Sequence, residues 1–185
     1  VAWGFTNTMV DDVDFFVETL NPKNKNEYKY DEEWRPITII EEKVPLKSGK
    51  DTTITIRLTH HGPIISDIHG LLKNSKNAIS MSWTGHWITS EMDAWIDVNL
   101  MKDWDDFSEA LKNFGVPGQN IVYADKKGNI GWRPAVFIPI RKEGFSMIPR
   151  PGTKSEYDWK GRVPYDEMPF LYNPPDGFIS TANNK

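Results

Sequence analysis

Hydrophobic and polar residues alternate along several stretches of the chain, and this pattern predicts β-hairpins. Residues 52–58 place isoleucine or leucine at every second position, with threonine or arginine between them. Residues 37–46 are rich in β-branched side chains, and a turn that contains Gly49 separates the two runs. A second pair of apolar runs, at 121–125 and 130–132, surrounds a Lys-Lys-Gly-Asn turn. We therefore expect two antiparallel hairpins.

One amphipathic helix is marked in the second half of the chain. Its apolar residues recur at steps of three, four and three positions, which places them on one helix face: Trp104, Phe107, Leu111 and Phe114. Asp103 can cap the N-terminus of this helix, and Gly115 with Pro117 predicts its end. The stretch 78–84 predicts a strand, and 90–102 is ambiguous, with helix or mixed structure favoured.

Two further regions lack a clear period. Residues 21–33 are polar and predict a surface loop or the frayed end of a helix. Residues 134–175 carry many prolines and predict an ordered, loop-rich crossing of the surface. Because hairpins dominate and no internal repeat occurs, the expected fold class is α+β with antiparallel sheet, not a series of βαβ units.

Composition narrows the class of protein. The 185 residues carry a formal charge of −4, and this mild acidity argues against a nucleic-acid-binding module. There is no run of about 18 apolar residues, as a membrane-spanning helix needs, and no cysteine for a disulfide or thiolate site. Eight Trp, six Tyr and nine Phe suit a thick core or an apolar pocket. Both ends look like cuts through structure, so we expect residues 1–185 to be one internal fragment of a longer polypeptide.

An acidic run, Asp11-Asp12-Val13-Asp14, is the first candidate for chemistry. Three carboxylates within four residues repel one another unless a cation or hydrogen-bond donors compensate them, and hard oxygen ligands suit calcium. Acidic residues are also favoured at a solvated helix N-terminus. The run lacks the twelve-residue loop pattern of an EF-hand, so local sequence alone favours the helix N-terminus.

The histidines and the C-terminal asparagines are less informative by themselves. None of the four histidines, His60, His61, His69 and His86, has the spacing of a known metal motif, so each is expected to lie in a turn or the core. The Asn183-Asn184 pair can donate to a developing oxyanion or simply form a turn. The residues alone therefore indicate no self-contained catalytic apparatus.

Several segments in one order give a sharper indication. They are Ala2-Trp3-Gly4-Phe5-Thr6-Asn7, Asp11-Asp12-Val13-Asp14, His61-Gly62-Pro63, Tyr123-Ala124-Asp125, Trp159-Lys160-Gly161 and Gly177-Phe178-Ile179. Together they resemble the penicillin acylase (penicillin amidase) family of N-terminal nucleophile hydrolases, over nearly the whole chain. The resemblance implies an internal fragment of the β chain and part of an αββα sandwich.

The resemblance also implies a reaction and its partners. Enzymes of this family cleave their own precursor, and the serine exposed at the start of the β chain attacks a linear amide, with its α-amino group as the base. Val1 has no hydroxyl, so that serine is expected upstream and the isolated fragment is expected to be inactive. The implied partners are the α chain, the rest of the β chain and a small amide substrate. A periplasmic or secreted location and self-association of the fragment are further expectations.

Site residues can be carried over from the family position by position. The oxyanion hole would consist of the Asn183 side-chain amide and the backbone N–H of Asn7, with Asn184 as the alternative to Asn183 in a register shifted by one residue. Trp95 matches an aromatic residue of the acyl pocket, with a core tryptophan as the alternative.

The family resemblance also implies a structural calcium ion. Its ligands would be Asp11, the carbonyl of Val13, and Asp14, together with groups from elsewhere, including a carbonyl near Ser146. A non-catalytic homologue, or a calcium-stabilised structural or binding module, stays open as the alternative function.

Overall fold

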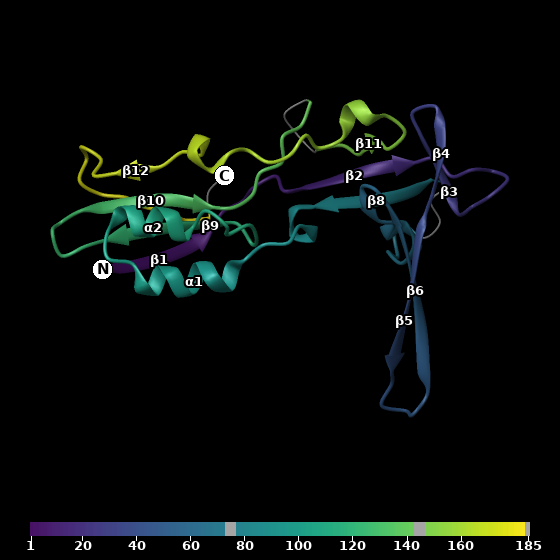
Figure 1. Cartoon of the computed structure of the whole chain (residues 1–185), viewed down its shortest axis with the longest axis horizontal. Coiled ribbons are helices and arrows are strands. Elements are labelled where there is room, and N and C mark those ends of the chain that lie inside the picture. Colours follow the sequence, from purple (N-terminus) through teal and green to yellow (C-terminus); the bar gives the residue numbers. More distant parts are fainter. Residues whose placement is uncertain (73–76, 143–146, 184–185) are drawn as a thin grey trace. The chain divides into compact units, whose positions relative to one another are not determined.

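The computed structural model describes residues 1–72, 77–142 and 147–183 (Figure 1). It is an α+β structure in which almost all strand pairs are antiparallel, as predicted. The chain divides into two compact units, each assembled from segments far apart in sequence. Unit 1 comprises Val1–Asp12, Thr84–Ile140 and Lys160–Lys185, and unit 2 comprises Val13–Trp83 and Arg141–Trp159.

Unit 1 is built on a four-stranded antiparallel sheet. The strand order is β1-β9-β10-β12, with bounds Ala2–Asn7, Gln119–Ala124, Ile130–Ala135 and Leu171–Tyr172. The β9–β10 hairpin confirms the hairpin that the apolar runs 121–125 and 130–132 predicted. Its turn is held by the Asp125 carboxylate, which accepts from the backbone N–H groups of Lys127 and Asn129 at 2.8 and 3.0 Å.

Two helices pack with this sheet in unit 1: α1 (Glu91–Leu100) and α2 (Trp104–Ala110). Their buried residues form one hydrophobic core with the sheet: Ala94, Val98, Phe107, Ala110, Leu111, Phe114, Ile121, Tyr123 and Ala135. The Asp103 side chain accepts from the N–H of Asp106 at 3.0 Å, which confirms the predicted N-cap. The helix ends at Ala110, earlier than predicted from Gly115, although Leu111 and Phe114 stay buried in the turns that follow.

Unit 2 contains a three-stranded sheet in the order β11-β2-β8. Strand β2 (Val13–Glu18) pairs antiparallel with β8 (Ala78–Trp83) and parallel with β11 (Arg150–Pro151). The expectation that the acidic run starts a helix is wrong, because Asp14 lies within β2. Its side chain shares the buried face of this strand with Phe16 and Glu18, as the two-residue period of a strand requires.

A short hairpin follows in unit 2, where the sequence predicted a loop or frayed helix. Strands β3 (Glu27–Tyr30) and β4 (Glu33–Pro36) pair antiparallel. Tyr28 and Tyr30 are 3% and 8% exposed and alternate with Glu27 and Lys29. The prediction failed because two tyrosines provide the whole apolar side of this strand, and the polar residues around them hide the alternation.

The first predicted hairpin is confirmed by β5 (Thr38–Pro45) and β6 (Asp51–Thr59), and β7 (Gly62–Pro63) extends its sheet. In Figure 1 the β5–β6 hairpin extends as a long two-stranded ribbon. Short 3₁₀ turns complete the chain at Ile65–Asp67, Thr84–His86, Ser155–Tyr157 and Tyr165–Glu167. Within the residues described, no helix has the length and apolar character needed to cross a membrane.

In the sheet of unit 1, one glycine is packed so closely against an aromatic ring that a larger residue would clash there. A Cβ added to Gly131 of β10 would lie 2.1 Å from the Trp104 ring, whereas a Cβ on Gly4 of β1 would meet only Val122, at 3.8 Å. We predict that Gly131→Ala destabilises the protein by about 1–3 kcal/mol through overpacking, and that Gly4→Ala has a much smaller effect. Urea unfolding of both variants checks this, and equal midpoints for the two would contradict it.

Candidate functional site

Among the strands that the structure describes, β1 lies at the edge of its sheet, and it carries the first predicted site residue, Asn7. The N–H of Thr8 donates to the carbonyl of Gly118 at 3.0 Å, and Asn7 lies opposite Gln119. In an antiparallel ladder, hydrogen-bonded pairs alternate with pairs whose N–H and C=O groups point outward. Asn7 therefore belongs to an outward-facing pair, and its N–H points away from β9. Its side chain is held separately, because Gln119 Nε2 donates to Asn7 Oδ1 at 3.2 Å.

An aromatic group lies along the same strand. Trp3 and Phe5 share a face of β1 with Asn7, since residues two apart point to one side of a strand. The Trp95 ring, from α1, stacks on Trp3 at 5.1 Å and contacts Phe5 at 5.4 Å. Trp95 also meets Phe114 edge-on at 5.3 Å, while Phe5 is 54% exposed. Trp3, Phe5 and Trp95, here called the β1 aromatic group, thus connect the core of unit 1 to an open surface.

Asn183 lies in the C-terminal segment of unit 1, after β12. Its side chain is exposed, and its backbone has φ of 52°, in the left-handed region that asparagine tolerates better than most residues. Within the described part of the chain, no hydrogen bond joins it to Asn7. Asn184, the alternative in the register, lies outside the described residues.

The acidic run contributes one deeply buried carboxylate, Asp14, in unit 2. Its Oδ2 accepts from Arg141 Nε at 2.7 Å and from the indole N–H of Trp159. Its Oδ1 is buried without a hydrogen-bond partner. Val13 begins β2 opposite Trp83. Asp11 is half-buried and precedes this strand, and Ser146 lies outside the described residues.

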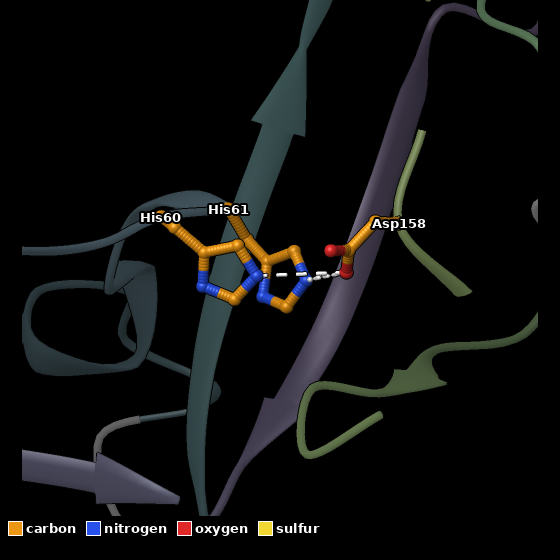
Figure 2. Close-up of side chains that lie close together, drawn as sticks. All are labelled: His60, His61 and Asp158. Atoms are coloured by element: carbon orange, nitrogen blue, oxygen red, sulfur yellow. Dashed lines mark hydrogen bonds and ion pairs between the residues drawn. The ribbon is translucent and has the colours of Figure 1, made fainter. Parts of the chain in front are cut away.

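A cluster that sequence reasoning missed lies elsewhere in unit 2 (Figure 2). His60 and His61 form the turn between β6 and β7, and both rings face the carboxylate of Asp158. Asp158 Oδ1 lies 3.1 Å from His61 Nε2 and 3.5 Å from His60 Nε2. The only signal in the sequence was the adjacency of two histidines, because Asp158 is 97 positions away from His61.

The rings of this cluster are fixed by buried neighbours. His61 is 6% exposed and stacks on Phe16 at 3.7 Å, so the prediction of a turn or core histidine is confirmed there. Burial lowers the pKa of His60, and the neighbouring His61 acts in the same direction. Burial, together with the hydrogen bond to Asp158, raises the pKa of Tyr30 to about 12, so this hydroxyl keeps its proton and donates to the carboxylate.

Comparisons with known proteins give one consistent family. The penicillin amidase family model matches residues 1–185. The chain is 32% identical over 185 residues to penicillin G acylase of Escherichia coli, covering 100% of this chain and 21% of that protein. It is 28% identical over 186 residues to the acyl-homoserine lactone acylase QuiP of Pseudomonas fluorescens, covering 100% of this chain and 23% of that protein. The chain thus spans about a fifth of the length of these relatives.

A solved structure agrees. The thermostable penicillin G acylase from Alcaligenes faecalis superposes with a TM-score of 0.84 at 31% identity, over 100% of this chain and 33% of that one. Because the family match covers every residue and a solved acylase shares the fold, this chain belongs to the penicillin amidase family.

Proposed function

We propose that this chain is an internal part of the β chain of an acylase that hydrolyses linear amides next to an apolar acyl group. The observation that carries the proposal is the outward-pointing N–H of Asn7, on a strand that also bears the β1 aromatic group. An oxyanion needs fixed donors that no other group of the fold consumes. The relatives named above are acylases, which supports the same class of reaction.

In the proposed reaction, the nucleophile is a serine at the N-terminus of the β chain, outside this chain. Its oxygen bonds to the amide carbon, its α-amino group takes the hydroxyl proton, and negative charge develops on the carbonyl oxygen. The N–H of Asn7 and the side-chain amide of Asn183 donate to that oxygen. The tetrahedral intermediate collapses, the C–N bond breaks, and the protonated amine leaves. Water then attacks the acyl-enzyme by the same route and releases the acid. This chain therefore supplies donors but no nucleophile, and the isolated chain is expected to be inactive.

The acyl group would lie against the β1 aromatic group. Phe5 presents an exposed ring two residues before Asn7, and the Trp95 ring contacts it at a tilt. A flat apolar wall next to the scissile carbonyl suits an aromatic or aliphatic acyl chain. Penicillin G and N-acyl-homoserine lactones, the compounds in the relatives' names, are the two substrate types to assay.

The rest of the protein would cover apolar surface that this chain leaves open. Large exposed side chains occur in both units, among them Phe5, Leu71, Ile88, Met147 and Phe178. Exposed apolar area of this kind is typical of a surface that packs against another part of a protein. We infer that the α chain and the remaining β chain bury it, and that the isolated fragment associates. A periplasmic or secreted location belongs to the same proposal.

A structural calcium ion is a further part of the proposal. Asp14 Oδ1 supports it, because a buried carboxylate oxygen without a hydrogen-bond partner suits a hard cation. Asp14, the carbonyl of Val13, and Asp11 would hold the ion. It would neutralise the acidic run and take no part in the chemistry.

The oxyanion assignment predicts the effect of one substitution. In the complete processed protein, Asn183→Ala should lower kcat about 100- to 1000-fold, because one donor to the oxyanion is lost. The matched control is Asn184→Ala, which should stay close to wild type. Steady-state hydrolysis of penicillin G or of an acyl-homoserine lactone measures both. An unaffected Asn183→Ala enzyme would remove this residue from the oxyanion hole, and a large loss in Asn184→Ala alone would move the register by one.

The calcium assignment predicts a stability effect. Removing calcium with EGTA should lower the melting temperature of the wild-type protein, and adding calcium back should restore it. In Asp14→Asn this calcium response should disappear, whereas in Asp12→Asn, within the same run but not an expected ligand, it should persist. Differential scanning calorimetry with and without calcium measures the responses. A wild-type protein that melts identically in EGTA and in calcium would contradict the assignment.

A further inference from the structure

Unit 2 contains a group of side chains that the acylase reaction does not use: His60, His61 and Asp158 (Figure 2). We propose that His60 Nε2, His61 Nε2 and Asp158 Oδ1 form a three-ligand site for a divalent transition-metal ion, with Zn²⁺ as the reference. The site is distinct from the acidic run, because it shares no residue with it. Two imidazoles and one carboxylate suit first-row transition metals, whereas calcium prefers oxygen ligands alone.

The spacing of the ligand atoms fits such an ion. Two ligands bonded to zinc at about 2.0–2.1 Å with a tetrahedral angle lie about 3.3–3.4 Å apart. Two edges of this triangle, from Asp158 Oδ1 to His61 Nε2 and to His60 Nε2, measure 3.1 and 3.5 Å. One ring nitrogen of each histidine and one carboxylate oxygen of Asp158 lie within 4.8 Å of one another. An ion can therefore enter without rearrangement of the backbone.

In each proposed ligand residue, the polar atom that would not bind the metal is hydrogen-bonded to a neighbouring side chain. Such hydrogen bonds orient the ligands in known metal sites. His61 Nδ1 lies 2.9 Å from Glu18 Oε1, and His60 Nδ1 lies 3.1 Å from the Tyr28 hydroxyl. The Tyr30 hydroxyl donates to Asp158 Oδ2. These outer contacts occupy both Nδ1 atoms and one carboxylate oxygen. They leave the Nε2 atoms and Asp158 Oδ1 directed at one another.

The contact between His61 Nε2 and Asp158 Oδ1 needs a positive charge between the two atoms. Glu18 Oε1 accepts hydrogen bonds from the hydroxyls of Thr59 and Ser80, at 2.8 and 2.7 Å. Because this carboxylate oxygen can only accept, the Nδ1 of His61 that faces it carries a proton and donates. A neutral His61 then presents its Nε2 lone pair to a second carboxylate oxygen, on Asp158. Two acceptors at 3.1 Å repel unless a proton or a metal ion lies between them. A divalent ion would also balance the negative charges of the Asp158 and Glu18 carboxylates. The Glu18 side chain is fully buried, so its charge needs such compensation.

Solvent can reach the proposed site from one side. The side chains of His60 and Asp158 are both 28% exposed, whereas that of His61 is 4% exposed. Three protein ligands with an open side leave a fourth position for water. The ion would join the β6–β7 turn to the segment that follows β11, and its binding would stabilise this part of unit 2.

The test measures metal binding to the complete protein. The protein is first stripped of metal and then kept in saturating calcium, so that calcium occupies the acidic run and Zn²⁺ binding there is not observed. Zn²⁺ is added and measured by isothermal titration calorimetry, with metal content determined after gel filtration, and Co²⁺ is added separately as a spectroscopic probe. We expect His60→Ala to bind one Zn²⁺ fewer per chain, or to bind it at least about 10-fold more weakly, and to lose the visible absorption of nitrogen-ligated Co²⁺. The matched control is His69→Ala, an exposed histidine outside the cluster, which should bind like wild type.

A second variant with a smaller change keeps the test valid if His60→Ala fails to fold. Tyr28→Phe removes only the hydroxyl that orients His60, and we expect it to weaken Zn²⁺ binding about 10- to 100-fold with an unchanged circular dichroism spectrum. Equal stoichiometry and affinity in wild type, His60→Ala and Tyr28→Phe would overturn the proposal. The cluster would then be a hydrogen-bonded ion pair in which a protonated His61 donates to both carboxylates.

Discussion

The antiparallel pairing of β1 with β9 decides which backbone N–H groups of β1 point out of the ladder. Each hydrogen-bonded pair of the ladder is followed by one whose N–H groups point outward, so the register of the two strands determines the direction of the Asn7 N–H. A shift of one residue would turn this N–H into the sheet and move Trp3 and Phe5 to the opposite face. One register therefore sets both the direction of the Asn7 N–H and the face of β1 on which Trp3 and Phe5 lie.

In unit 2 the corresponding constraint is a buried carboxylate, that of Glu18. One oxygen accepts hydrogen bonds from Thr59 and Ser80 and lies 2.9 Å from His61 Nδ1, which fixes the β6–β7 turn against β2 and β8. The segment after β11 can approach because Gly152 has no side chain, and a Cβ there would lie 2.3 Å from the other oxygen of Glu18. The hydrogen bonds to this first oxygen offset part of the cost of burying the charge, and they hold the histidine turn in place.

Local patterns in the sequence predicted much of the fold but little of the chemistry. Alternation located both hairpins, and the position of Asp103 located the start of α2, because these signals act over a few residues. The β3–β4 hairpin was missed, since its apolar side consists of Tyr28 and Tyr30 alone. The acidic run was expected at a helix start, although Asp14 is paired with Arg141 inside a strand. The outward N–H of Asn7 and the approach of Asp158 to two histidines depend on strand register and on contacts distant in sequence. Local patterns do not contain that information.

The claim that this chain provides the oxyanion donors of a self-processing acylase is tested most directly on the complete protein. The measurement is intact mass together with N-terminal sequencing of each chain after expression. The account predicts two chains, of which the second begins with serine and contains residues 1–185. A single unprocessed polypeptide without serine, threonine or cysteine at the expected junction would contradict it, and the family membership would then reflect a shared fold without the catalytic reaction.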